Sequence, residues 1–163
     1  GDNIKAMIKW CRDKNIEASF SGIDIKETCI DYAKQNLAGH DNIHWIRSDY
    51  KDVQFGNKPD IIFSSLFCHH FTDEQLIEIV RWKFENSKLG FFINDLHRNP
   101  IAFYAIKLLT SLFSSSYLVK NDAPLSVQRG FSKQDWSTIF KTAGLSPQIS
   151  WEWAFRWLII LKK

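Results

Sequence analysis

The sequence predicts an α/β fold built on a doubly wound, mostly parallel sheet with helices on both faces. Three observations support this fold class. Segments with strand character alternate along the chain with segments of helical periodicity. Residues 59–67 are nearly continuously apolar, as expected of a parallel strand that is covered on both faces. The last two strand-like segments are separated by a link too short for a parallel crossover, so they are expected to pair antiparallel.

The first part of the chain alternates between helix and strand. Apolar residues spaced three and four apart follow Gly1 and predict a helix that Asp2 or Asn3 can cap. The next apolar stretch is a strand ending near Asp24, and a third strand ends near Asp49. In order, this part is predicted as helix 2–11, strand 18–25, helix 26–37, strand 43–48 and a polar connection over 51–58.

The remaining elements follow from caps and apolar runs. Thr72 and Ser132 are candidate helix caps, and Gly144 suits a helix end. The serine-rich stretch after residue 113 predicts a loop or lid that continues to Gly130. In order, this part is predicted as strand 59–67, helix 72–86, strand 89–96, helix 100–113, loop 114–130, helix 132–144 and strands 146–151 and 156–161.

Length and composition are those of one globular domain, predicted over 1–163 with a helix or loop lid at about 97–130. The net charge of +3 comes from scattered basic residues, so no nucleic-acid partner is expected. Three widely spaced cysteines indicate a reducing compartment, and a cytoplasmic location is expected. No stretch is long and apolar enough to span a membrane.

A parallel α/β sheet that opens with a helix lacks its first strand. In a doubly wound sheet, that strand would lie between the strands ending at Asp24 and at Phe67. We therefore expect residues preceding Gly1 to supply it, while a different sheet order remains the alternative.

Four features resemble one known family. Gly1-Asp2 is similar to the tail of a glycine-rich turn, Asp24 ends the second strand in Gly22-Ile-Asp-Ile25, and Asp49 follows the third. Residues 63–71, Phe-Ser-Ser-Leu-Phe-Cys-His-His-Phe, resemble the fourth strand and its exit. Together they resemble class I S-adenosylmethionine-dependent methyltransferases of the small-molecule type, which have a Rossmann-like fold. Four further segments resemble a bacterial, polyketide-associated subgroup that is similar to ubiquinone/menaquinone-type methyltransferases: Asn94-Asp-Leu-His-Arg98, Pro100-Ile-Ala-Phe-Tyr, Pro124-Leu-Ser-Val and Arg129-Gly-Phe. The resemblance implies a chain truncated before or within the glycine-rich motif.

The resemblance implies S-adenosylmethionine as cofactor, S-adenosylhomocysteine as product and no metal. Asp24 is implied to bind the ribose hydroxyls, although it could instead cap the next helix. Asp49 is implied to meet the adenine amino group, or else is an ordinary loop carboxylate. The implied cofactor-binding residues are Gly1, Asp24, Ile25, Ser48, Asp49, Tyr50, Ser64, Ser65 and Leu66.

His69 and His70 are the candidate catalytic residues, because imidazole can accept a proton from a hydroxyl near neutral pH. Either could instead cap a helix or orient the loop. Adjacent side chains rarely converge on one metal ion, so Cys68 with these histidines is a poor metal site. The candidate substrate residues are Asp95, Arg98, Phe103 and Arg129, with salt bridges and helix packing as their structural alternatives.

The expected activity is methylation of a small, aromatic or polyketide/quinone-like hydroxyl acceptor. Two alternatives stay open: an NAD(P)-dependent oxidoreductase, and a non-catalytic S-adenosylmethionine-binding subunit. The terminal antiparallel strand pair disfavours the first, and the polar set with Asp24, Asp49 and the two histidines disfavours the second. The oligomeric state stays open, with a homodimer as one option.

Overall fold

The fold is taken from a computed structural model in which residues 2–40 and 42–163 are described. The chain divides into two compact units, Gly1–Gly56 and Asn57–Lys163. Within the described part of the chain no helix combines the length and the apolar character needed to cross a bilayer.

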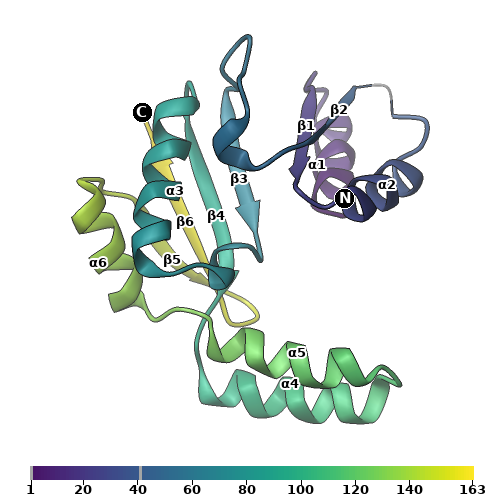
Figure 1. The fold of residues 1–163 in the computed structure, drawn as a ribbon, viewed down its shortest axis with the longest axis vertical. Coiled ribbons are helices and arrows are strands. Elements are labelled where there is room, and N and C mark those ends of the chain that lie inside the picture. The colour runs from purple at the N-terminus through teal and green to yellow at the C-terminus, as the bar shows by residue number, and fades with distance from the viewer. Residues whose placement is uncertain (1, 41) are drawn as a thin grey trace. The chain divides into compact units, whose positions relative to one another are not determined.

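The first unit is a pair of parallel strands with helices (Figure 1). Strands β1 and β2 pair parallel, with Asp24 opposite Arg47 at their carboxyl ends. Gly22 lies opposite Trp45, and a side chain at Gly22 would collide with the Trp45 indole. Its elements are α1 (Asp2–Asp13), β1 (Phe20–Asp24), α2 (Glu27–Asn36), β2 (Ile43–Arg47) and the 3₁₀ helix η1 (Tyr50–Asp52).

The second unit contains a four-stranded sheet in the order β3-β4-β6-β5. Strand β4 pairs parallel with β3 and antiparallel with β6, and β5 with β6 forms the predicted antiparallel pair. Its elements are β3 (Ile61–Ser65), η2 (Cys68–His70), α3 (Asp73–Asn86), β4 (Gly90–Leu96), α4 (Pro100–Phe113), α5 (Tyr117–Gln128), α6 (Lys133–Ala143), β5 (Gln148–Glu152) and β6 (Arg156–Lys162).

These strands and helices form the expected Rossmann-like α/β fold with its C-terminal antiparallel strand pair. Within the described residues, β1 pairs only with β2, and β3 pairs only with β4.

The predicted helix caps of the second unit are confirmed. The Thr72 side chain accepts a hydrogen bond from the Gln75 N–H, and the Gln75 side-chain oxygen accepts one from the Thr72 N–H. Ser132 and Asp135 form the same reciprocal box at the start of α6. Each box satisfies backbone donors that a helix start leaves unpaired.

Residues 117–128 form helix α5, so the loop predicted over 114–130 is wrong for most of its length. Ser116, read in the sequence as part of a loop, instead accepts a hydrogen bond from the Val119 N–H and caps the helix. Pro124 lies inside the helix and is buried. Helices α4 and α5 lie side by side as a hairpin that extends from the sheet of their unit (Figure 1).

The core of the second unit lies between its sheet and the helices α3 and α6 (Figure 1). Trp136 of α6 is completely buried and its ring lies 4.4 Å from that of Phe131. Phe140 of the same helix stacks on Phe91 of β4. This layer fixes β4, the strand that carries Asp95.

Gly90 starts β4 in a conformation that side chains rarely adopt, with φ of +134°. A Cβ there would run into the carbonyl oxygen of Leu161 on β6. We expect Gly90→Ala to lower the free energy of unfolding by about 2–4 kcal/mol, through combined backbone strain and overpacking. Urea unfolding checks this, with Gly56→Ala as the control because no atom lies within 4 Å of a Cβ at Gly56. Equal losses in both variants would contradict the explanation.

Candidate functional site

Asp24 ends strand β1, and only one of its two carboxylate oxygens accepts a hydrogen bond within the described residues. One oxygen accepts a hydrogen bond of 2.8 Å from the Lys26 N–H. Arg47, opposite in the register, forms an ion pair of 2.8 Å with Glu27 instead. Within the described residues the second oxygen of Asp24 has no partner, so it can accept hydrogen bonds from a ligand.

Asp49 lies beside Asp24, just beyond the end of β2. The Ser48 N–H donates to the Asp24 carbonyl oxygen at 3.1 Å, which continues the strand pairing past Arg47. One carboxylate oxygen of Asp49 accepts from the Lys51 N–H at 3.0 Å, and the Ser48 hydroxyl donates to the Asp49 carbonyl at 2.9 Å. Both acids therefore lie at the carboxyl edge of two neighbouring parallel strands, the edge at which open α/β sheets bind ligands.

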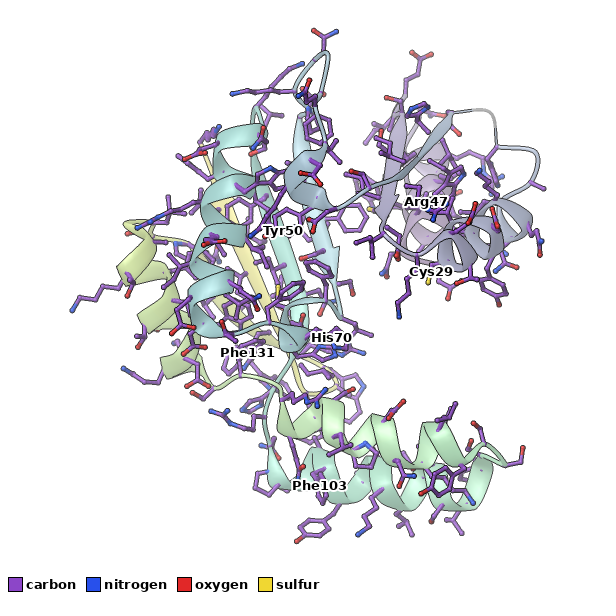
Figure 2. All side chains as sticks on the ribbon, viewed as in Figure 1. Cys29, Arg47, Tyr50, His70, Phe103 and Phe131 are labelled. Atoms are coloured by element: carbon purple, nitrogen blue, oxygen red, sulfur yellow. The ribbon has the colours of Figure 1, made fainter. Side chains whose placement is uncertain are left out.

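Two further candidates flank these acids. The Ile25 side chain is 63% exposed directly after Asp24. Tyr50 is half-buried at the start of η1, and the Lys51 ammonium lies 5.9 Å from its ring centroid (Figure 2). Gly1 lies outside the described residues.

One hollow of the first unit lies away from these acids. It has a volume of about 350 Å³ and is lined by Ile8, Ile16, Phe20 and Asn42, among others. Phe20 and Asn42 lie at the amino ends of β1 and β2, opposite to the edge that carries Asp24. The hollow is therefore not the site predicted from the acids.

The Asp95 side chain of β4 is fully buried, and both of its oxygens take part in hydrogen bonds. One oxygen accepts from the backbone N–H groups of Phe67 and Cys68 at 2.9 and 2.7 Å. The other accepts from the Leu96 N–H at 2.8 Å and lies 2.7 Å from Nδ1 of His69. With four partners and no exposure, Asp95 has no oxygen to offer a substrate here. In the described structure Asp95 therefore holds the loop after β3, and its contact with a substrate stays a prediction.

The pKa of Asp95 is lowered in the folded protein. Burial alone would raise it, but the hydrogen bond from His69, the Leu96 and Cys68 N–H groups and the nearby imidazole outweigh burial. The carboxylate is therefore ionised at neutral pH and can only accept hydrogen bonds. It follows that Nδ1 of His69 carries the proton, and that Nε2 is the basic nitrogen of the neutral ring.

The two histidines differ in their surroundings. His69 is buried, at 6% exposure, whereas His70 is exposed. Their rings lie 4.2 Å apart on η2, the short helix that follows β3 (Figure 2). His69 thus has a fixed orientation and tautomer, and His70 faces solvent.

Cys68, between the strand exit and these histidines, is a neutral thiol. Burial raises its pKa to about 12, and the Asp95 charge adds to this, against smaller opposing effects of Lys83 and Ser64. A thiolate nucleophile at this position is therefore excluded at neutral pH. Within the described residues no group of three or more metal-ligating side chains gathers.

Residues 64–66 carry the chain out of β3. Ser64 and Ser65 are half-buried, and the Ser64 hydroxyl lies 3.9 Å from the Cys68 sulfur. Leu66 has a φ of +53°, unusual for a residue with a side chain, and its side chain is 44% exposed. Such backbone strain is concentrated at ligand-binding sites, although it does not identify the ligand.

Arg98 and Phe103 line one hollow of about 270 Å³ at the root of the α4–α5 hairpin. The Arg98 guanidinium is paired with Asp135 at 2.6 Å, which favours the structural alternative for this residue. Arg129 ends α5, is exposed and does not line the hollow. The four expected substrate residues are therefore not brought together.

Lys83 was not predicted to be special, yet its side chain is buried under α3. Within the described residues its ammonium group has no hydrogen-bond or ion-pair partner. Burial lowers its pKa to about 8, against an opposing effect of Cys68. Nothing in the sequence distinguishes it from neighbouring exposed cations such as Arg81 and Lys88.

We expect Lys83→Met to raise the free energy of unfolding at pH 7 by about 1–3 kcal/mol, because burying an unpaired charge is costly. Between pH 8 and 10.5 the unfolded chain holds a proton on Lys83 that the folded chain has released. Wild-type stability should therefore rise with pH across this window, and the advantage of the variant should shrink. Urea unfolding at pH 7 and pH 10 measures this, and an advantage equal at both pH values would contradict it.

Comparison with known proteins identifies the family of the chain. Residues 1–117 match the sequence pattern of a family described as a methyltransferase domain. No curated protein matches the sequence. Solved structures of similar fold include magnesium protoporphyrin IX methyltransferase of Synechocystis PCC 6803 with bound S-adenosylhomocysteine, at 15% identity and a TM-score of 0.55 over 90% of this chain.

Two further structures have the same fold. Human N-acetylserotonin methyltransferase with bound S-adenosylmethionine is 18% identical, with a TM-score of 0.60 over 90% of this chain. A protein described as a pericyclic reaction enzyme is 14% identical, with a TM-score of 0.64 over 97%. The chain spans 64%, 41% and 39% of the length of these three structures. At such identities the likeness shows the fold and leaves the chemistry open.

Proposed function

The chain belongs to the methyltransferase domain family, and on that premise we propose that it binds S-adenosylmethionine and methylates a hydroxyl group of a small, aromatic or quinone-like acceptor. One observation carries the proposal: Asp24 and Asp49 lie together at the carboxyl edge of β1 and β2. Two carboxylates at this edge can accept hydrogen bonds from the ribose hydroxyls and the adenine amino group of one nucleoside.

The residues of the first unit fit such a ligand. The unpaired oxygen of Asp24 would accept from the ribose, and the exposed Ile25 side chain offers an apolar surface for the base. Asp49 would accept from the adenine amino group, with Tyr50 beside it. When bound, the cofactor supplies an electrophilic methyl group on its sulfonium.

The second unit supplies the acid–base residues of the proposal. His69 would accept the hydroxyl proton of the acceptor at Nε2, because Asp95 holds the proton on Nδ1. The Asp95 carboxylate would then stabilise the imidazolium that forms, as a positioning residue that does not touch the acceptor. Ser64, Ser65 and Leu66 stay proposed cofactor contacts at the strand exit.

The hollow at the root of the hairpin is the proposed acceptor region. Phe103 provides an aromatic wall there, and Arg98 provides a cation, although its pairing with Asp135 reduces what it can offer. Arg129 stays a weaker candidate, since it would have to reach the hollow from the end of α5. We further propose a cytoplasmic bacterial protein that does not bind nucleic acid.

Calorimetric titration of the natural full-length protein tests the proposal. We expect S-adenosylhomocysteine to bind with micromolar affinity and NADH to bind at least about a hundredfold more weakly, a difference of some 2.7 kcal/mol. Tight NADH binding without S-adenosylhomocysteine binding would assign the chain to the oxidoreductases instead.

Transfer of a labelled methyl group to a panel of phenols and quinols tests the catalytic part. Turnover that His69→Gln lowers far more than cofactor affinity supports methyl transfer. Cofactor binding without product from any acceptor would favour a binding subunit, or another chemistry on the same fold.

A further inference from the structure

The α4–α5 hairpin exposes an unusual amount of apolar surface. Ten of the nineteen large hydrophobic side chains that are exposed in the described structure belong to these two helices. The two most exposed, Phe113 and Tyr117 at 82% and 78%, lie at the turn between the helices, and Leu118 next to them is 68% exposed. The ten residues are Ile101, Tyr104, Leu108, Leu109, Leu112, Phe113, Tyr117, Leu118, Val119 and Leu125.

The exposure follows from how the hairpin packs. Ala102 and Thr110 of α4 and Pro124 and Val127 of α5 are the buried residues of the two helices. Each helix therefore buries only two of its residues. The outer face of α4 and the turn remain uncovered, in contrast to α3 and α6, which pack on the sheet and each other.

The charged side chains of this segment are mostly basic. Of the 18 acidic residues in the chain only Asp122 lies within residues 97–131. The same residues carry four basic side chains, Arg98, Lys107, Lys120 and Arg129, of which only Arg98 has an ion-pair partner within the described residues. The apolar face is thus flanked by cations with almost no anions.

We propose that the α4–α5 hairpin is a membrane-surface anchor that inserts its turn and the outer face of α4 into an anionic lipid bilayer. Apolar and aromatic side chains with flanking lysines are the composition of helices that lie in a bilayer interface. Tyrosine suits the headgroup boundary because it joins an apolar ring to a polar hydroxyl, and phenylalanine and leucine provide the apolar face that inserts. Each lysine near an anionic surface adds about 1 kcal/mol of attraction.

A second copy of the chain fits this face less well. In a two-fold interface the same patch meets itself, so the basic residues of one copy would lie near those of the other, with only Asp122 of each copy to neutralise them. Like charges brought together in this way oppose association. An anionic bilayer would bury the apolar side chains among its lipids and would attract the basic side chains to its headgroups.

Vesicle flotation of the natural full-length protein, without cofactor or acceptor, tests the anchor independently of the proposed enzyme activity. We expect at least about tenfold more protein on vesicles of phosphatidylcholine with phosphatidylglycerol than on phosphatidylcholine alone. Phe113→Ser with Leu118→Ser should lower binding about tenfold, and so should Lys107→Glu with Lys120→Glu. Leu89→Ser is the matched control, because Leu89 is 60% exposed in the same unit outside the hairpin. Circular dichroism confirms that each variant is folded.

Three results would overturn the anchor. One is no flotation with either vesicle, and another is an equal loss in Leu89→Ser and the hairpin variants. The third is a stable dimer that Phe113→Ser with Leu118→Ser dissociates while the wild type leaves vesicles unbound, which would assign the face to a second copy.

Discussion

Asp95→Ala is expected to lower the free energy of unfolding by about 3–5 kcal/mol, since it leaves several buried donors without an acceptor. The N–H groups of Phe67, Cys68 and Leu96 and the Nδ1 proton of His69 all depend on this one carboxylate. Urea unfolding at pH 7 measures the loss. Asp60→Ala is the control, because Asp60 is exposed and only loosely paired with Lys88 at 3.5 Å.

The contribution of Asp95 should also depend on pH. Its pKa is lowered in the folded protein, so the stability it provides is present above its ordinary pKa near 4. That stability is lost as the pH falls through the lower folded value, since the folded carboxylate must then be protonated. The difference in the free energy of unfolding between the wild type and Asp95→Ala should therefore decrease only at acidic pH. A variant within about 1 kcal/mol of the wild type at pH 7 would show that the four hydrogen bonds are not important for stability.

Asp24→Asn is expected to weaken S-adenosylhomocysteine binding by at least about thirtyfold, or some 2 kcal/mol. A carboxylate is a stronger acceptor than an amide, and hydrogen bonds to charged groups contribute about 1.5–3 kcal/mol each. Stability should change little, because the only hydrogen bond of the Asp24 side chain within the described residues comes from the exposed Lys26 N–H. Calorimetry in the full-length protein measures the affinity.

Asp31→Asn provides the comparison for Asp24→Asn. Asp31 is exposed on α2 of the same unit and loses the same charge, but it lies away from the strand ends. We expect the affinity of Asp31→Asn for S-adenosylhomocysteine to stay within about twofold of the wild-type value, since the effect of a distant exposed charge is screened by salt. Equal weakening in both variants would mean that net charge, not a contact with the ribose, explains the effect.

The sequence predicts most of the fold because its strongest local signals agree with the tertiary structure. Helix 100–113 is found with the predicted bounds, as α4, and the caps Thr72 and Ser132 make the predicted bonds. Helix α5 was missed because serines and Pro124 are typical of loops. In the structure Ser116 caps the helix, and the packing against α4 stabilises a segment with weak helical signals of its own.

The candidate site is only partly predictable from sequence. Asp24 and Asp49 could be placed side by side, because acids that end neighbouring parallel strands meet at one edge. The burial of Asp95 could not be predicted, since it depends on the loop after β3 folding over β4 to donate two N–H groups to it. The buried Lys83 depends in the same way on how α3 lies on the sheet, which no residue pattern records.

The central claim is that Asp24 and Asp49 bind one nucleoside, and a crystal structure of the natural full-length protein with S-adenosylhomocysteine tests it most directly. We predict Asp24 carboxylate oxygens within about 2.6–3.2 Å of the ribose hydroxyls, and Asp49 at the same distance from the adenine amino group. A nucleoside bound in the hollow lined by Ile16 and Phe20, or one that leaves both carboxylates facing solvent, would contradict the claim.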